Sequence, residues 1–156
     1  TTWYLGGTTY KTSNPPYETY TVNELYESER GTQVYSKHAT TSTDYIGLIY
    51  PSDYGYASTD ASCRQNLRSG ITYTNNAYGG TPTCKNNNWL FKGVWYWAIL
   101  PHSSYAYDVF FVFSDGGLHH SQVLYRESVR PSLYLKSDIK IASGSGTKDD
   151  AFKLEI

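Results

Sequence analysis

The sequence has few charged residues and almost no excess of either sign. Charged side chains make up 17% of the 156 residues, and 13 basic residues stand against 14 acidic ones, so the formal net charge is -1. Proteins that bind nucleic acid or anionic membranes through charge need a basic surface, which this composition does not supply. No stretch approaches the roughly 18 consecutive apolar residues of a membrane-spanning helix. We therefore expect no nucleic-acid partner and no membrane insertion by this segment.

Motifs for catalysis, metal binding and cofactor binding are also missing from the sequence. None of the four histidines has a partner at a zinc-binding spacing, and no serine lies in a nucleophile-elbow motif. The paired glycines lack the surroundings of a phosphate-binding loop. His119 and His120 are neighbours on an expected strand, so they point to opposite faces and cannot chelate one ion together. We expect no enzymatic activity, no metal and no cofactor.

The chain has only two cysteines and no methionine. Cys63 and Cys84 flank a segment rich in Gly, Asn and Thr, a pattern typical of a disulfide formed in an oxidising compartment. The scarcity of Lys, Arg and Glu beside abundant Tyr, Asn, Ser and Thr favours the same interpretation. The alternative is a pair of free buried thiols in a cytosolic protein. We predict a Cys63–Cys84 disulfide and an extracellular location.

Tyrosine is the residue that the sequence has in excess, with 17 copies. Its side chain offers a wide apolar ring with a polar tip and freezes few rotors on binding, so recognition surfaces use it heavily. Strands also favour tyrosine, so a β-rich fold without a ligand explains the excess equally well. The length fits one compact domain with its own core.

Two short helices are predicted in the first half of the chain. Thr21 can form a capping box with Glu24 and begins an amphipathic helix that ends at Gly31. Residues 58–70 start with Ser, Thr and Asp, which cap helices well, and end with Gly, which favours a second helix.

Strands are predicted at residues 3–5, at 45–50 and through most of the second half. The apolar segment 45–50 should stop at Pro51, and residues 71–88 have the composition of a long loop. The fold class expected from these elements is α+β, with two short helices packed on antiparallel β-sheets. Three tryptophans of the β-rich half are expected in the core: Trp89, Trp95 and Trp97.

Residues 105–125 predict a β-hairpin, because two strand-like arms flank a Ser-Asp-Gly-Gly turn. Neither face of the return arm, residues 118–125, is wholly apolar, which indicates that one side meets loops or a ligand. After the hairpin, residues 128–141 supply one or two further strands, and Arg130 is expected to bind a carboxylate or carbonyls near the core. Residues 142–156 are predicted to be a Gly/Ser-rich linker with a final short strand. With no internal repeat, the chain is expected to be a single domain.

Several segments, in the order in which they occur, resemble a large family of uncharacterised bacterial surface domains from gut bacteria of the Firmicutes type. Some members of that family are carried behind a prepilin-like helix. The resemblance implies an extracellular, cell-surface protein. The matching segments are WYLGG, ESERGTQVYS, IGLIYPSDYGYAS, CKNNNWL, WAILP, VFSDG and VRPSLYLKSDIKI.

The closing part of the chain is similar to the C-type-lectin fold of formylglycine-generating-enzyme-like domains and of the variable proteins of diversity-generating retroelements. Residues 128–130, Ser-Val-Arg, stand where that group has Gly-Phe-Arg or Gly-Val-Arg. The calcium motifs of lectins and the catalytic cysteine pair of the enzymes have no counterpart here. In the variable proteins the segment before the closing strand binds ligand. The ligand-binding residues implied by this similarity are Tyr105, Tyr107, Asp108, Leu118, His119, His120, Gln122 and Tyr125.

The function that these observations favour is an extracellular ligand-binding or adhesion module. It would present a Tyr/His-rich hairpin to a protein or glycan on another cell or surface. The alternative is the globular head of a pilin-like filament subunit, whose surface would pack against other pilus subunits and need no dedicated ligand.

Overall fold

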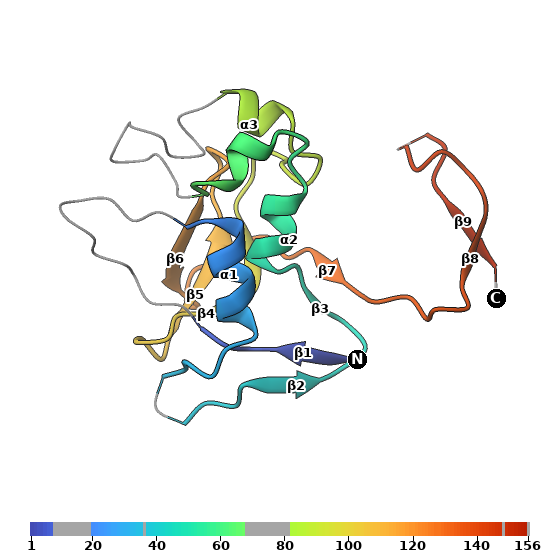
Figure 1. Ribbon diagram of the computed structural model, residues 1–156. Helices are drawn as coiled ribbons and strands as arrows, with labels where there is room; N and C mark the ends of the chain where they lie inside the picture. The colour runs from blue at the N-terminus through green and yellow to red at the C-terminus, as the bar shows by residue number, and fades with distance from the viewer. Residues whose placement is uncertain (8–19, 36, 68–81, 148, 156) are drawn as a thin grey trace.

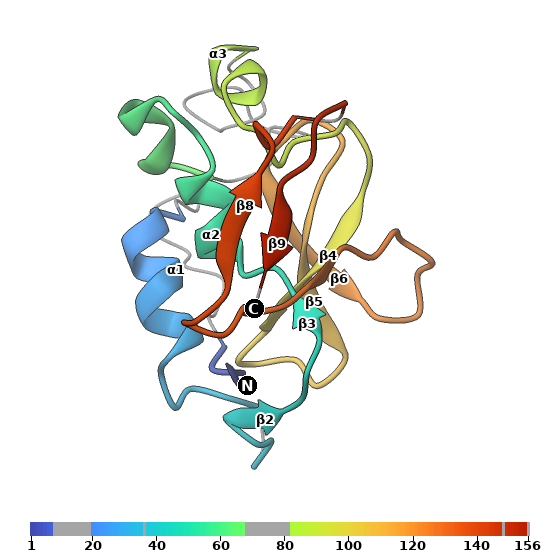
Figure 2. The same cartoon turned by 90° about the vertical axis from the view of Figure 1, so that its right-hand side faces the viewer.

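The computed structural model describes residues 1–7, 20–35, 37–67, 82–147 and 149–155. Its body has two layers (Figure 1), with helices α1 (Val22–Glu29) and α2 (Pro51–Tyr56) in one. The other layer is an antiparallel sheet in the order β4-β5-β6 (Tyr96–Pro101, Asp108–Val112 and Leu118–Gln122). Figure 2 shows both helices beside the same face of this sheet. The predicted α+β class is confirmed.

Helix α1 begins where the sequence predicts it. The Glu24 backbone N–H donates to Thr21 Oγ1 at 3.2 Å, and the Thr21 N–H donates to the Glu24 carboxylate at 3.3 Å. Two otherwise unpaired donors of the first turn are thereby satisfied. The same helix buries Val22 and Leu25 against the rest of the body.

Helix α2 was not predicted. Pro51 ends the preceding strand, as expected, but it also occupies the first turn of a helix. Proline suits that position because its fixed φ is helical and its missing N–H would have had no helical acceptor. The predicted strand 45–50 is therefore reduced to β3 (Gly47–Leu48), which pairs with β7 (Pro131–Ser132).

The predicted helix at 58–70 is wrong in type and length. Only a single 3₁₀ turn, η1 (Ala61–Arg64), forms within its described part, and it follows Asp60, whose carboxylate accepts from Ser62 N at 2.9 Å. Residues 68–70 lie outside the described residues. A helix from residue 58 is excluded because Ser58 forms a β-bridge with Asn88 and Thr59 N donates to the Asn87 carbonyl.

The Cys63–Cys84 disulfide is confirmed. Cys63 lies on η1, and Cys84 lies on α3 (Pro82–Asn86), a short helix inside the predicted loop 71–88. Residues 71–81 of that loop lie outside the described residues. Both half-cystines are buried, so the bridge fixes two short elements to the core rather than to the surface.

The core lies between the helices and one face of the sheet. Tyr54 of α2 is fully buried and its hydroxyl donates to the Gly116 carbonyl at 2.6 Å, which joins α2 to the turn between β5 and β6. The sheet contributes alternate residues, as strand geometry requires. These are Tyr96, Ala98, Leu100, Phe110, Val112 and Leu118.

The prediction that Trp89, Trp95 and Trp97 form the core is wrong. Trp89 is 69% exposed, Trp95 is also exposed and Trp97 is half-buried. For Trp95 and Trp97 alternation is the reason, because Tyr96 and Ala98 face the helices and their neighbours face away, whereas Trp89 lies in the turn after α3. Trp95 and Trp97 pack on Phe111, with ring centroids 5.6 and 5.7 Å apart, on the sheet face opposite to the helices.

The remaining strands form two separate pairs. β1 (Thr2–Tyr4) pairs with β2 (Thr41–Thr43), and its Trp3 is buried beside Gly47, where a Cβ would lie 2.6 Å from the indole. β8 (Lys140–Ser143) pairs with β9 (Lys153–Glu155) in a hairpin that projects from the body (Figure 1). The predicted final strand is confirmed, but the expected linker folds back as part of this hairpin. No helix in the described ranges is long and apolar enough to cross a membrane.

Candidate functional site

An open pocket of about 280 Å³ lies at the end of the β5–β6 hairpin. Six of the eight residues predicted as ligand-binding line it, together with Ser121, which the sequence did not single out. The lining residues are Tyr105, Tyr107, Asp108, His120, Ser121, Gln122 and Tyr125.

The pocket is the polar end of a strand face whose other end is core. Val112 lies opposite Leu118 under the helices, and the next same-face pair, Phe110 and His120, lies nearer the pocket. The last pair on this face is Asp108 and Gln122. The strand arms therefore change from apolar to polar along a single face, which explains why the return arm alternates poorly in the sequence.

Two of the predicted ligand-binding residues are not in the pocket. Leu118 has an exposed fraction of 0% and packs in the core, so its assignment to a ligand is wrong. The His119 ring lies 5.8 Å from Phe111, on the face of the sheet away from the helices. Because strand neighbours alternate between faces, His120 enters the pocket and His119 does not.

A histidine–carboxylate pair forms the floor of the pocket. His120 Nδ1 lies 2.9 Å from Asp108 Oδ2, and both side chains are mostly buried. Burial lowers the pKa of His120 below its ordinary value, and the hydrogen bond to Asp108 offsets only part of that shift. A neutral His120 then carries its proton on Nδ1, since it is this atom that donates to the carboxylate.

A second buried histidine, His102, packs against His120. The His102 and His120 rings have centroids 4.6 Å apart, and His102 accepts from the Ser104 N–H. Burial, with a smaller contribution from His120, lowers the pKa of His102 to about 4. Sequence analysis did not assign His102 to the site, because nothing in the local pattern shows that its strand position faces the hairpin.

The pocket has an aromatic rim and, beneath it, an unsatisfied acceptor. Tyr105, Tyr107 and Tyr125 are exposed around its rim. Asp108 Oδ1 is shielded from solvent and has no hydrogen-bond partner among the described residues. Such an oxygen loses its hydration on folding without gaining a protein partner, which costs about 1–3 kcal/mol. The arrangement is suited to binding.

A larger cleft, of about 670 Å³, lies between α2 and the β7 segment and was missed by sequence analysis. Exposed Trp89 and Tyr56 form part of its wall, with Asp53 and Arg130 beside them. Arg130 Nη1 donates to the Leu90 carbonyl at 2.5 Å and its guanidinium lies 4.9 Å from the Tyr96 ring centre. The predicted structural role of Arg130 is confirmed.

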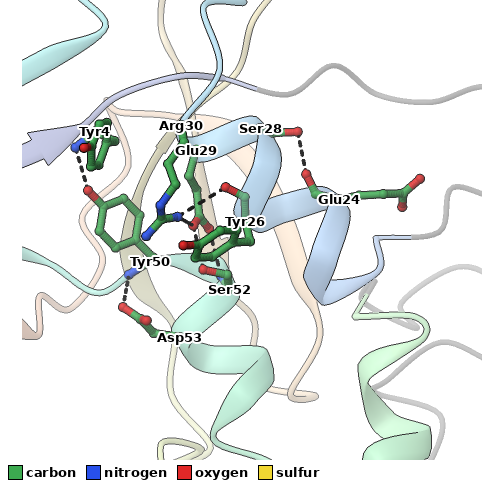
Figure 3. Close-up of polar contacts among 9 residues, drawn as sticks. All are labelled: Tyr4, Glu24, Tyr26, Ser28, Glu29, Arg30, Tyr50, Ser52 and Asp53. Atoms are coloured by element: carbon green, nitrogen blue, oxygen red, sulfur yellow. Dashed lines mark hydrogen bonds and ion pairs between the residues drawn. The ribbon is translucent and has the colours of Figure 1, made fainter.

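A buried carboxylate joins α1 to α2 (Figure 3). Glu29 is fully buried and accepts from the Ser52 N–H at 2.8 Å and the Ser52 hydroxyl at 2.6 Å. Arg30 donates to the same carboxylate at 3.1 Å while its guanidinium stacks 3.6 Å from the Tyr26 ring centre. Burial nevertheless raises the pKa of Glu29 to about 7.

No group of three or more metal-binding side chains occurs within the described part of the chain.

Comparison with known proteins finds no matching family model, no similar curated protein and no similar solved structure.

Proposed function

We propose that this domain is an extracellular recognition module. A C-type-lectin-like scaffold would hold the β5–β6 pocket open toward a protein or glycan on another cell or surface. The observation that carries the proposal is the gathering of six predicted residues in one pocket, from the loop before β5 to the end of β6. The Cys63–Cys84 disulfide supports the extracellular location, because such bridges persist in oxidising compartments.

The rim and the floor of the pocket have different roles in this proposal. The exposed rings of Tyr105, Tyr107 and Tyr125 supply contact area at a low entropic cost. The Asp108–His120 pair supplies a fixed polar floor, because the hydrogen bond between the two side chains holds both in place.

The backbone around the pocket is held before any ligand arrives. His102 N donates to the Asp108 carbonyl at 2.9 Å, and Val123 N donates to the Tyr107 carbonyl at 2.9 Å. Beneath them Phe110 is fully buried. A pre-organised site loses less conformational entropy on binding, which favours affinity.

Alanine replacement of Tyr107 and Tyr125 tests the proposal. The double variant should lose binding at least about tenfold in a screen of glycans and cell-surface proteins, because interface tyrosines often contribute more than 1 kcal/mol each. Its melting temperature should stay close to that of the wild-type domain, since both side chains are exposed. The matched control is Tyr45→Ala, because Tyr45 is 87% exposed and lines neither pocket.

Equal loss of binding in the Tyr45 control would show that the pocket is not the site. If the wild-type domain binds nothing in the screen, that result favours the alternative that this domain is the head of a filament subunit. Unfolding of the double variant would show that the two rings support the fold, contrary to their exposure.

A further inference from the structure

The β8–β9 hairpin leaves its apolar face uncovered. Ile141 lies directly opposite Leu154, and their side chains are 59% and 48% exposed. Phe152, which directly precedes β9, is also exposed. The other side carries charges, with Lys140 opposite Glu155. The ribbon is thus amphipathic, and Figure 1 shows it standing away from the body.

Such a ribbon needs a partner. A two-stranded hairpin alone is at best marginally stable in water, and an unpaired edge strand is a template for pairing with another chain. Among the described residues, β8 and β9 pair only with each other. An apolar face in this position is expected to be covered by another molecule.

The free edge of β9 is complementary to itself. Its sequence is Lys153-Leu154-Glu155. In an antiparallel pairing centred on Leu154, Lys153 would lie opposite the partner's Glu155, and each Leu154 would lie opposite the partner's Leu154. Opposite charges and apolar pairs at facing positions stabilise antiparallel strands. The β8 edge has no such symmetry, because Lys140-Ile141-Ala142-Ser143 contains no acidic residue.

We propose that two copies of this domain associate through β9 into a four-stranded antiparallel sheet, β8-β9 of one copy continuing into β9-β8 of the other. One face of that sheet carries a continuous apolar stripe that begins and ends at Ile141. The contact is isologous and closes on itself, so it produces dimers and not chains. Each dimer presents two β5–β6 pockets, but the dimer does not depend on what those pockets bind.

Sedimentation velocity of the intact domain tests this proposal. A contact this small belongs to the transient class, so we expect a reversible dimer with a dissociation constant on the order of 10–100 µM. Lys153→Glu places like charges opposite each other twice in the symmetric contact and should raise that constant at least about tenfold. Within its own hairpin Lys153 lies opposite Ser143, so this variant keeps the intramolecular charge pair.

A complementary variant distinguishes pairing from damage. Lys140→Glu combined with Glu155→Lys keeps opposite charges across the hairpin but leaves β9 with two lysines. This variant and Lys153→Glu should each dimerise at least about tenfold more weakly alone, while an equal mixture should regain the wild-type association. A monomeric wild-type domain up to about 1 mM, which is above the expected range, overturns the proposal. Dimerisation of Lys153→Glu at wild-type strength, or a mixture that stays monomeric, also overturns it.

Discussion

Glu29 shows how much one residue can matter at the junction of two helices. Its carboxylate is removed from water and lies against the first turn of α2, where the Ser52 N–H and hydroxyl donate to it. Those bonds and Arg30 favour the charged form, but burial outweighs them and raises the pKa from 4.5 to about 7. The interaction between α1 and α2 is therefore linked to pH.

The sign of that linkage can be measured with Glu29→Gln. Below the unfolded-state pKa of 4.5, Glu29 is protonated in both the folded and the unfolded chain, and no free energy of unfolding is lost to its ionisation. As pH rises toward the folded-state value of about 7, the unfolded chain ionises first and the free energy of unfolding falls. This contribution is on the order of 3 kcal/mol. The variant lacks the titration, so its stability relative to wild type should increase over this range.

Chemical denaturation of both proteins from about pH 4 to pH 8 gives the required difference. Taking the difference removes the opposite trend from His102, whose lowered pKa reduces stability as pH falls from 6.5 toward 4. A difference that does not vary with pH would show that Glu29 titrates normally.

Short elements of this protein depend on what they pair with more than on their own sequence. η1 and α3 are each one turn or little more, too short to be stable alone. The disulfide between Cys63 and Cys84 and the bridge between Ser58 and Asn88 hold them together. Helix α1 differs, because it is longer and has its own capping box, so its stability depends less on other segments.

Replacing both Cys63 and Cys84 with serine should lower the free energy of unfolding by about 3 kcal/mol, the chain-entropy value for a loop of this length. Thermal unfolding of the double variant, compared with wild type in the absence of reductant, measures the loss. Reduced wild-type protein provides the control and should melt near the variant. An unchanged melting temperature would mean that the packing of η1 and α3 does not depend on the bridge.

The molecule as a whole consists of a packed body and a projecting hairpin with different physical characters. The body buries side chains from α1, α2 and one face of the β4-β5-β6 sheet. Residues 140–143 and 151–155 are all exposed. The free energy of folding therefore comes mainly from the body, and the hairpin adds exposed surface.

Deletion of residues 137–156 tests whether the body is stable without the hairpin. The shortened domain should melt within about 2 °C of the full domain at low concentration, because the deleted part buries little apolar area against the body. Tyr134, which packs on Trp3 with ring centroids 5.2 Å apart, is retained. A much lower melting temperature in dilute solution would show that the hairpin stabilises its own body.

Sequence by itself determined the features that depend on neighbours along the chain. The Thr21–Glu24 capping box, the β5–β6 hairpin and the Cys63–Cys84 pair each follow from short-range patterns or from cysteine count. The predicted pocket residues share the hairpin, so six of them came together once it formed. Only the tertiary structure decided which strand face the helices cover. That choice buried Leu118 and turned Trp97 to the opposite face, because burial is set by contacts between segments far apart in the chain, which no local pattern specifies.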